Sequence, residues 1–146
     1  MIECFDGEFA FLSNFYPSLI AVDGIMFPTV EHLFQAAKTV SLVEREKIAA
    51  AATPGQAKRL GRNVILCDNW EEIKDDVMLN ALRLKFAILS LREKLLATGN
   101  EELVEGNTWH DNIWGNCSCD RCKNIEGQNK LGKLLMQVRE EIKSSM

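Results

Sequence analysis

The chain has 146 residues, a hydrophobic content of 47% and a formal net charge of −4, with a pI near 5.3. This length and apolar content predict one globular domain with a substantial core. The acidic balance argues against a dedicated nucleic-acid binder, which usually has a basic surface, although a local basic patch stays compatible with it. No apolar run approaches the roughly 20 residues that span a bilayer, and the first residues lack a secretory signal pattern. We therefore expect a cytoplasmic protein with reduced cysteines, no membrane contact and no obligate protein partner.

The first 28 residues are typical of short strands and turns. Residues 2–5 and 20–27 are rich in β-branched and aromatic types, which favour strands. Asp23 and Gly24 lie between two such runs and predict a two-residue hairpin turn, because both central positions of that turn require positive φ.

An aromatic-rich loop at residues 11–17 has two interpretations. The loop is either fixed to the core by its aromatic side chains, or it forms a pocket wall. In the second case Asn14 would donate or accept a hydrogen bond with a ligand, and a ring such as Phe15 would stack on it.

Residues 28–38 predict the start of a helix around which we expect the other elements to be arranged. Thr29 is placed to cap the helix, and Pro28 prevents its extension backwards. At about 100° per residue, Glu31, Gln35 and Lys38 fall on one face beside an apolar stripe. This polar stripe is either a solvated surface or the edge of a binding site.

Two further helices are predicted by their capping patterns. Ser41 opens one that runs to about Ala52, and Thr53 opens another that ends near Gly61. The second helix brings three basic side chains close together: Lys58, Arg59 and Arg62. Such a cluster is either a solvated face or, beside a cleft, a phosphate-binding site.

Apolar residues at three- and four-residue intervals predict a longer helix from Trp70 to about Leu91, capped by residues 68–69. Trp70 is interpreted as a hydrophobic staple or as a stacking platform. Lys85 lies deep in this helix near the apolar border and needs a partner there. Gly99 is suited to end the helical run that follows.

The segment from Glu105 to Gly115 is a polar turn region, in which Asp111 lies between two tryptophans. A final amphipathic helix is predicted from Gln128 onward, with Asn129 as its cap.

The cysteines offer a zinc site as an open alternative. Cys117, Cys119 and Cys122 place three thiols within six residues, and Cys4 or Cys67 is the candidate for a fourth ligand. Zinc sites usually show paired C-x2-C units, so a single C-x-C-x2-C pattern also fits reduced loop thiols. We expect no metal and no cofactor in the reaction itself. The two histidines show no spacing that indicates a Cys-His catalytic pair.

Several motifs in register along almost the whole chain together resemble the NADAR (YbiA-like) family. The motifs are Phe11-Leu-Ser-Asn-Phe15, Asp23-Gly24, Pro28-Thr-Val-Glu-His32 with Gln35 and Lys38, Gly61-Arg62, Asn69-Trp70, Met78 with Lys85-Phe86, Thr98-Gly99, Leu103-Val-Glu105, Asp111 with Trp114-Gly115, Gly127-x-Asn129-x-Leu131-Gly132 and Leu135-Met136-x-Val138-Arg139. The chain departs from the bacterial members at residues 117–123, where they have a glycine-rich stretch and this chain has three cysteines.

The resemblance implies a fold of the α+β class that is predominantly helical, a single compact domain with a small antiparallel β portion near the N-terminus. It also implies an N-glycosidase that cleaves the bond between a phosphorylated ribose and a base. The implied substrates are riboflavin-pathway ribosylaminopyrimidine intermediates, or ADP-ribosylated guanine in nucleic acid. A non-catalytic module that binds ADP-ribose or a related nucleotide is the alternative function.

The family's functional positions that match here are Glu31, Trp70 and Asp111, and Lys38 matches a lysine for which a Schiff-base role has been considered. We expect Glu31 to stabilise the oxocarbenium-like charge at C1′ or to activate water, and Asp111 to handle water or the leaving group. The expected substrate contacts are made by Asn14, Phe15, Gln35, Arg59, Arg62, Lys85, Trp114, Gly115 and Asn129, with the basic members binding phosphate.

Overall fold

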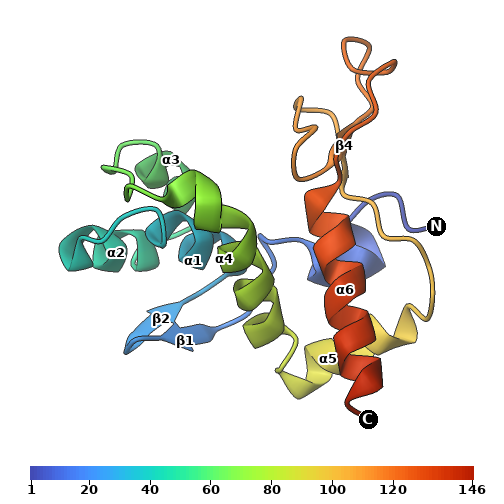
Figure 1. Ribbon diagram of the computed structural model, residues 1–146, viewed down its shortest axis with the longest axis horizontal. Helices are drawn as coiled ribbons and strands as arrows, with labels where there is room; N and C mark the ends of the chain where they lie inside the picture. The colour runs from blue at the N-terminus through green and yellow to red at the C-terminus, as the bar shows by residue number, and fades with distance from the viewer. The chain divides into compact units, whose positions relative to one another are not determined.

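A computed structural model describes all 146 residues of the chain, and Figure 1 shows a mainly helical molecule with a small antiparallel sheet. The fold class predicted from the sequence is therefore confirmed. The chain forms two compact units: a central unit of residues 14–85, and a terminal unit of residues 1–13 and 86–146. None of the helices combines the length and the apolar character needed to cross a bilayer.

The central unit begins with the predicted hairpin. Strands β1 (Ile20–Val22) and β2 (Ile25–Phe27) pair antiparallel, with Ile20 opposite Phe27. Asp23 and Gly24 have φ values of 51° and 79°, the left-handed conformations that this two-residue turn requires.

Three short helices follow: α1 (Val30–Ala36), α2 (Leu42–Ala49) and α3 (Pro54–Gly61). The hydroxyls of Thr29, Ser41 and Thr53 each accept a hydrogen bond from the backbone N–H three residues later, as their capping patterns predict. Helix α1 contacts both α2 and α3. Helix α2 ends at Ala49 and not at the predicted Ala52, because residues 51–53 form the turn into α3.

His32 joins α1 to that turn. Its side chain is 1% exposed, with Nδ1 2.7 Å from the Thr29 hydroxyl and Nε2 3.0 Å from the Ala51 carbonyl oxygen. A carbonyl only accepts, so Nε2 carries the donated proton. The Thr29 hydroxyl accepts from the His32 backbone N–H and can donate to Nδ1. His32 is therefore a structural residue.

The long helix predicted from Trp70 to Leu91 is wrong in its extent. Helix α4 (Trp70–Lys85) ends at the boundary of the central unit, and α5 (Leu89–Ala97) begins separately with Ile88 as its N-cap residue in an extended conformation. Apolar periodicity continues across the break, and neither glycine nor proline marks it.

The terminal unit contains a short 3-10 helix η1 (Gly7–Leu12), α5 and α6 (Lys130–Ser144), with α5 contacting both other helices. Gly99 follows α5 with φ of 64°, as expected for a helix-ending glycine. Residues 2–5 are not the predicted strand: Ile2 forms only an isolated parallel bridge with Leu103.

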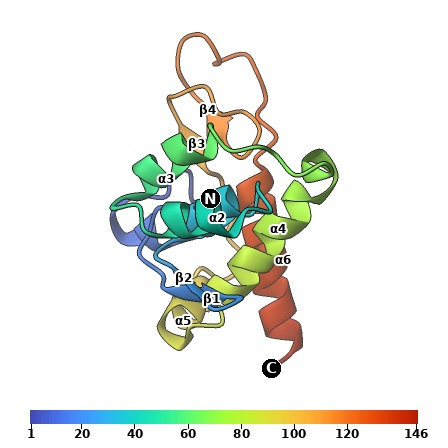
Figure 2. The same cartoon turned by 90° about the vertical axis from the view of Figure 1, so that its left-hand side faces the viewer.

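A second small sheet in this unit was not predicted. Strands β3 (Gly106–Asn107) and β4 (Asn116–Cys117) pair in parallel, and Figure 2 shows both at the base of a long loop. The buried face of α6 carries Leu131, Leu135 and Val138, which confirms the predicted apolar stripe.

Candidate active site

Glu31 lies in the first turn of α1 and is buried, with 7% of its surface exposed. Its backbone N–H donates to the carbonyl oxygen of Asn14 at 3.1 Å, which holds the aromatic-rich loop against the start of the helix. The Nε2 amide of Gln35, one turn later, donates to Glu31 Oε1 at 2.8 Å. Glu31 and Gln35 of the predicted polar stripe therefore lie together and are buried, whereas Lys38 is half-buried and lies beyond the end of α1.

The electrostatic setting of Glu31 combines opposed effects. Burial raises the pKa of its carboxyl group, because the ionised form loses water. The hydrogen bond from Gln35 and the positive charges of Lys58 and Lys38 lower the same pKa, with a smaller combined effect. The result is a carboxylic acid whose pKa lies above its usual range beside two cations, which is typical of a functional site.

Gln35 is fixed by the close approach of α3. A Cβ atom at Gly61 would overlap Gln35 Oε1 and lie 2.8 Å from its Cδ atom. Gly61 was predicted as a helix terminator, and α3 does end there, but the packing explains its requirement for glycine.

Lys38, Lys58 and Arg62 form the basic group around Glu31. Burial lowers the pKa of Lys38, Glu31 raises it, and Arg62 and Lys58 lower it further. Lys58 and Arg62 are four residues apart and share one face, whereas Arg59 is turned about 100° from Lys58. Lys58 is half-buried, and both arginines are exposed. The sequence grouped the three basic residues but did not identify Lys58 as the neighbour of Glu31.

Asn14 has a buried side chain oxygen, Oδ1, with no hydrogen-bond partner within the protein, while its Nδ2 lies 3.6 Å from the sulfur of Met78. A buried, unsatisfied acceptor beside Glu31 is available to a donor group on a ligand. The adjacent Phe15 is 45% exposed, so this ring does not fix the loop to the core.

Trp70 is 6% exposed and packs on Phe34, with ring centroids 5.1 Å apart and planes inclined by 59°. This tertiary contact joins the first turn of α4 to α1, whereas the predicted hydrophobic staple would be a contact at the start of α4 itself. A stacking role toward substrate stays a prediction.

Lys85 is fully buried at the end of α4. Its ammonium nitrogen lies 5.9 Å from the centre of the Tyr16 ring, and burial lowers its pKa from 10.5 to about 7. Contact with a phosphate would require this side chain to be uncovered, so its phosphate-binding role stays a prediction.

Asp111 lies in a tight turn of the terminal unit. Its Oδ1 atom accepts hydrogen bonds from the backbone N–H groups of Ile113, at 3.1 Å, and Trp114, at 2.9 Å. The side chain of Asn107 bonds both the N–H and the carbonyl of Asp111. One carboxylate oxygen therefore shapes the turn, and a catalytic role for the group stays a prediction.

Gly115 and Asn129 support the same segment. A Cβ at Gly115 would overlap Glu105, so only glycine fits there. Asn129 donates to the Leu103 carbonyl and accepts from the Glu105 N–H. It precedes α6 as predicted, but its φ of 49° and the absence of a side-chain cap bond differ from the capping that we expected. The substrate contacts expected of Gly115 and Asn129 stay predictions.

Four side chains that could bind a metal ion lie together: His110, Cys117, Cys119 and Cys122. The sequence pattern identified the three cysteines, but it did not identify His110 as the fourth residue.

A family model described as the NADAR domain matches residues 4–143. The chain belongs to the NADAR family. The NADAR chain is 43% identical to N-glycosidase YbiA of Shigella flexneri serotype 5b, over 92% of this chain and 82% of the relative. An N-glycosidase of Nostoc punctiforme is 41% identical, over 90% and 85% of the respective chains. The predicted reaction class, N-glycosidase, is confirmed at this level.

The solution NMR structure of YbiA from Escherichia coli is also similar to this NADAR chain. It superimposes with a TM-score of 0.80 at 39% identity, covering 99% of this chain and 88% of that one.

We predict that Gly61→Ala displaces Gln35 and breaks its hydrogen bond to Glu31. The free energy of unfolding should fall by about 1–3 kcal/mol, as in other overpacked cores. Gly55→Ala on the same helix is the matched control, because its nearest neighbour would lie 3.8 Å from the new Cβ, an ordinary contact. Denaturant unfolding of both variants is the measurement, and equal stability of the two would contradict this account of Gly61.

We predict that Lys85→Met changes how stability depends on pH. The unfolded lysine keeps its proton up to about pH 10.5 and the folded one releases it above about 7. The unfolded chain therefore binds more protons between these values, and Lys85 makes the wild type gain stability as pH rises.

Lys85→Met should accordingly be more stable than the wild type at pH 6 and show a flatter rise from pH 7 to 10. Urea unfolding across this range measures the effect, with Lys47→Met as the control because that side chain is 62% exposed. An unchanged slope in Lys85→Met would refute the assignment of the shift to Lys85.

Proposed function

We propose that this NADAR protein hydrolyses the N-glycosidic bond between a phosphorylated ribose and a base. The observation that carries the proposal is the buried Glu31 carboxylate, held by Gln35 and flanked by Lys38 and Lys58. The N-glycosidase relatives support the reaction class, and they leave the binding-only alternative without support.

The proposed chemistry uses Glu31 in its ionised form. Cleavage of the C–N bond develops positive charge at C1′ of the ribose, and a nearby carboxylate either stabilises that charge or activates the attacking water. The low-polarity surroundings that raise the pKa of Glu31 also strengthen its attraction to a developing cation. The positive charges of Lys58 and Lys38 favour this ionised form.

The same basic side chains are suited to the phosphate of the substrate. Arg62 and Lys58 extend the positive region from Lys38 along α3, and guanidinium groups bind phosphate oxygens in pairs. We assign Arg59 and Lys85 as further phosphate contacts. They are secondary in this proposal, because neither is among the charges that shift the pKa of Glu31.

The remaining positions are assigned around the ribose and the base. The unsatisfied Asn14 Oδ1 accepts from a hydroxyl or amine of the substrate, and Phe15 and Trp70 flank a ring. Asp111 is assigned the proton transfer to the leaving base. Trp114, Gly115 and Asn129 are assigned to that side of the substrate through the turn that Asp111 organises.

In the proposal, Lys38 has one of two alternative roles. It either pairs electrostatically with Glu31, or its neutral amine attacks C1′ of the ring-opened sugar. In the second case the base leaves as its free amine, and water hydrolyses the resulting imine. The lowered pKa of Lys38 favours the neutral amine that this attack needs. Borohydride reduction with substrate present traps an imine, and an absent adduct would exclude the covalent role.

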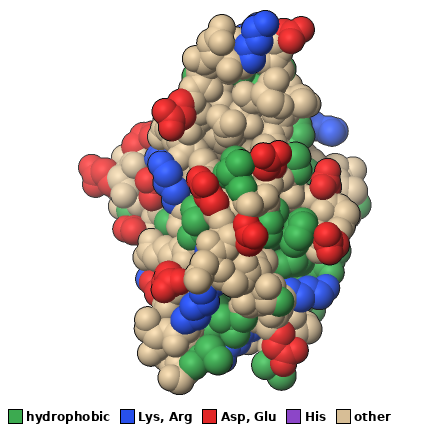
Figure 3. Space-filling view, turned by 90° about the vertical axis from the view of Figure 1, so that its right-hand side faces the viewer, with side chains coloured by type: hydrophobic (Ala, Val, Ile, Leu, Met, Phe, Trp, Pro, Cys, Tyr) green, Lys and Arg blue, Asp and Glu red, His purple; other side chains and the backbone are tan.

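For the substrate, we propose riboflavin-pathway ribosylaminopyrimidine phosphates ahead of ADP-ribosylated guanine. Relatives from Vibrio vulnificus and maize are named riboflavin biosynthesis proteins, although this chain spans only 36% and 23% of their lengths. The face shown in Figure 3 has acidic side chains interspersed with basic ones, and the net charge of −4 disfavours long nucleic acid. A turnover comparison of the two substrate types distinguishes them.

We predict that Glu31→Gln lowers kcat by about 100-fold or more, because it removes the charge that acts at C1′. Folding should persist, since a glutamine oxygen can still accept from Gln35 and the change removes a buried ionisable group. Release of free base measured by chromatography gives kcat, and denaturant unfolding gives stability. Glu46→Gln, on an exposed position of α2, is the control. Near-normal turnover in Glu31→Gln would remove Glu31 from the mechanism.

We predict that Lys58→Met moves the acidic limb of the pH profile of kcat/KM to higher pH, by up to about one unit. Lys58 lowers the pKa of Glu31, so removing its charge lets burial raise that pKa further. The base form of Glu31 is then reached only at higher pH. Lys47→Met is the control: it leaves Lys58 and its charge near Glu31, so the acidic limb of the pH profile should not move. An unmoved limb in Lys58→Met would show that Glu31 does not control it.

A further inference from the structure

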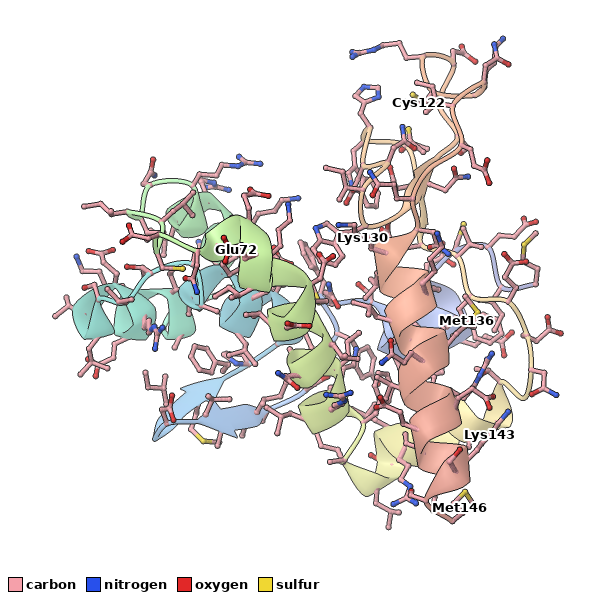
Figure 4. The ribbon with its side chains drawn as sticks, in the orientation of Figure 1. Glu72, Cys122, Lys130, Met136, Lys143 and Met146 are labelled. Atoms are coloured by element: carbon pink, nitrogen blue, oxygen red, sulfur yellow. The ribbon has the colours of Figure 1, made fainter.

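The loop between β3 and α6 contains four metal-ligand atoms that face one another. The Nδ1 atom of His110 lies 3.2 Å from the sulfur of Cys119, 3.6 Å from that of Cys122 and 4.0 Å from that of Cys117. All four ligand atoms lie within 4.8 Å of one another. Figure 4 shows Cys122 in this loop, beyond the end of α6 that carries Lys130.

These distances match a tetrahedral zinc site. Zinc binds thiolate sulfur at about 2.3 Å and imidazole nitrogen at about 2.0 Å, so tetrahedral geometry separates a sulfur and a nitrogen ligand by about 3.5 Å. The three distances from His110 Nδ1 to the sulfurs, 3.2, 3.6 and 4.0 Å, lie within about 0.5 Å of this value. Only small side-chain movements would be needed to place a single ion between the four atoms.

The thiols of this loop are buried although the large apolar side chains of the loop do not cover them as a core. Cys117 and Cys122 are 1% and 5% exposed, yet the large apolar side chains of the same loop, Trp109, Ile113 and Ile125, are 60%, 47% and 52% exposed. No disulfide joins any of the cysteines. A loop of this length without an apolar core of its own usually needs another source of order, and a bound metal ion supplies one.

The backbone is also arranged for thiolate ligands. The His110 N–H donates to the Cys117 sulfur at 3.3 Å, and the Cys117 N–H donates to Asn112 Oδ1 at 2.9 Å. An N–H donor to sulfur stabilises a negatively charged ligand, and such outer contacts orient metal ligands. His110 has φ of 70°, a left-handed conformation that costs a non-glycine residue about 1 kcal/mol or more, and its ring lies against the sulfurs.

We propose that His110, Cys117, Cys119 and Cys122 form a structural Cys3His zinc site. Binding transfers the thiol protons to solvent, and the neutral imidazole coordinates through Nδ1. The four protein ligands complete the coordination shell, so no position stays open for substrate or for a reactive water, and the role is structural. The ion would join the two ends of the segment that contains Asp111 and Trp114, and so hold that turn in place.

The test is the zinc content of the full-length protein, purified without chelator from zinc-supplemented cells. We expect one zinc per chain by elemental analysis after gel filtration. X-ray absorption at the zinc edge should show three sulfur ligands at about 2.3 Å and one nitrogen at about 2.0 Å. These readouts are independent of glycosidase activity, so they stand apart from the proposal for Glu31.

Variants locate the site. Cys119→Ser should weaken zinc binding by more than about 100-fold in competition with a chromogenic chelator, since the loss of even an outer contact costs 10–100-fold. Cys67→Ser is the matched control, because Cys67 lies in the central unit outside the cluster, and it should bind zinc as the wild type does. Zinc removal should also increase amide hydrogen exchange across residues 108–126.

Three results would overturn the proposal: less than stoichiometric zinc in wild type after zinc addition, wild-type affinity in Cys119→Ser, or a disulfide between cluster cysteines in the freshly isolated protein. If Cys119→Ser does not fold, the ligand set from X-ray absorption of the wild type still decides the outcome, because a site without three sulfurs and one nitrogen would refute it.

Discussion

The Glu31 carboxylate is buried at the start of α1, and the elements around it in the central unit offset the cost of that burial. Gln35 donates to one carboxylate oxygen, the Asn14 carbonyl accepts from the backbone, and two lysines supply positive charge. A buried ionised carboxylate without such partners would be strongly destabilising. The packing of α3 on α1 is therefore an electrostatic requirement as well as an apolar contact.

This arrangement links the fold to the chemistry through Gly61. Because Gly61 has no side chain, α3 approaches closely enough to hold Gln35 in place, and the same helix brings Lys58 and Arg62 toward Glu31. One short helix thus supplies the steric constraint on the hydrogen-bond donor and the positive field. In the proposed reaction, a cationic transition state at C1′ would meet a fixed carboxylate, and the basic groups of α3 are the ones we propose to bind phosphate.

Local patterns predicted the local structure well. The capping hydroxyls of Thr29, Ser41 and Thr53, and the Asp23-Gly24 turn, depend on residues close in sequence, so their signals are read directly from the chain. The break after Lys85 could not be read in this way, because apolar periodicity continues through it and tertiary packing decides where the helix ends. The roles of Gly61 and Lys58 likewise depend on how two helices approach each other.

The cysteine loop shows the same limit. The C-x-C-x2-C spacing identified three thiols, but His110 is seven residues before Cys117 and has a left-handed backbone, so local spacing gave no sign that its ring meets the sulfurs. In the candidate active site, helical geometry grouped Glu31 and Gln35 correctly, whereas their burial depends on residues distant in sequence, such as Gly61.

The most direct test of the central claim is a carbon-13 NMR titration of the Glu31 side-chain carboxyl in the unliganded protein. A buried carboxylate whose desolvation outweighs its hydrogen bond and its lysine neighbours should titrate with a pKa above the ordinary glutamate value. A pKa at or below that value would contradict this account. It would mean that Glu31 is solvated, or that its partners outweigh the desolvation of its carboxylate.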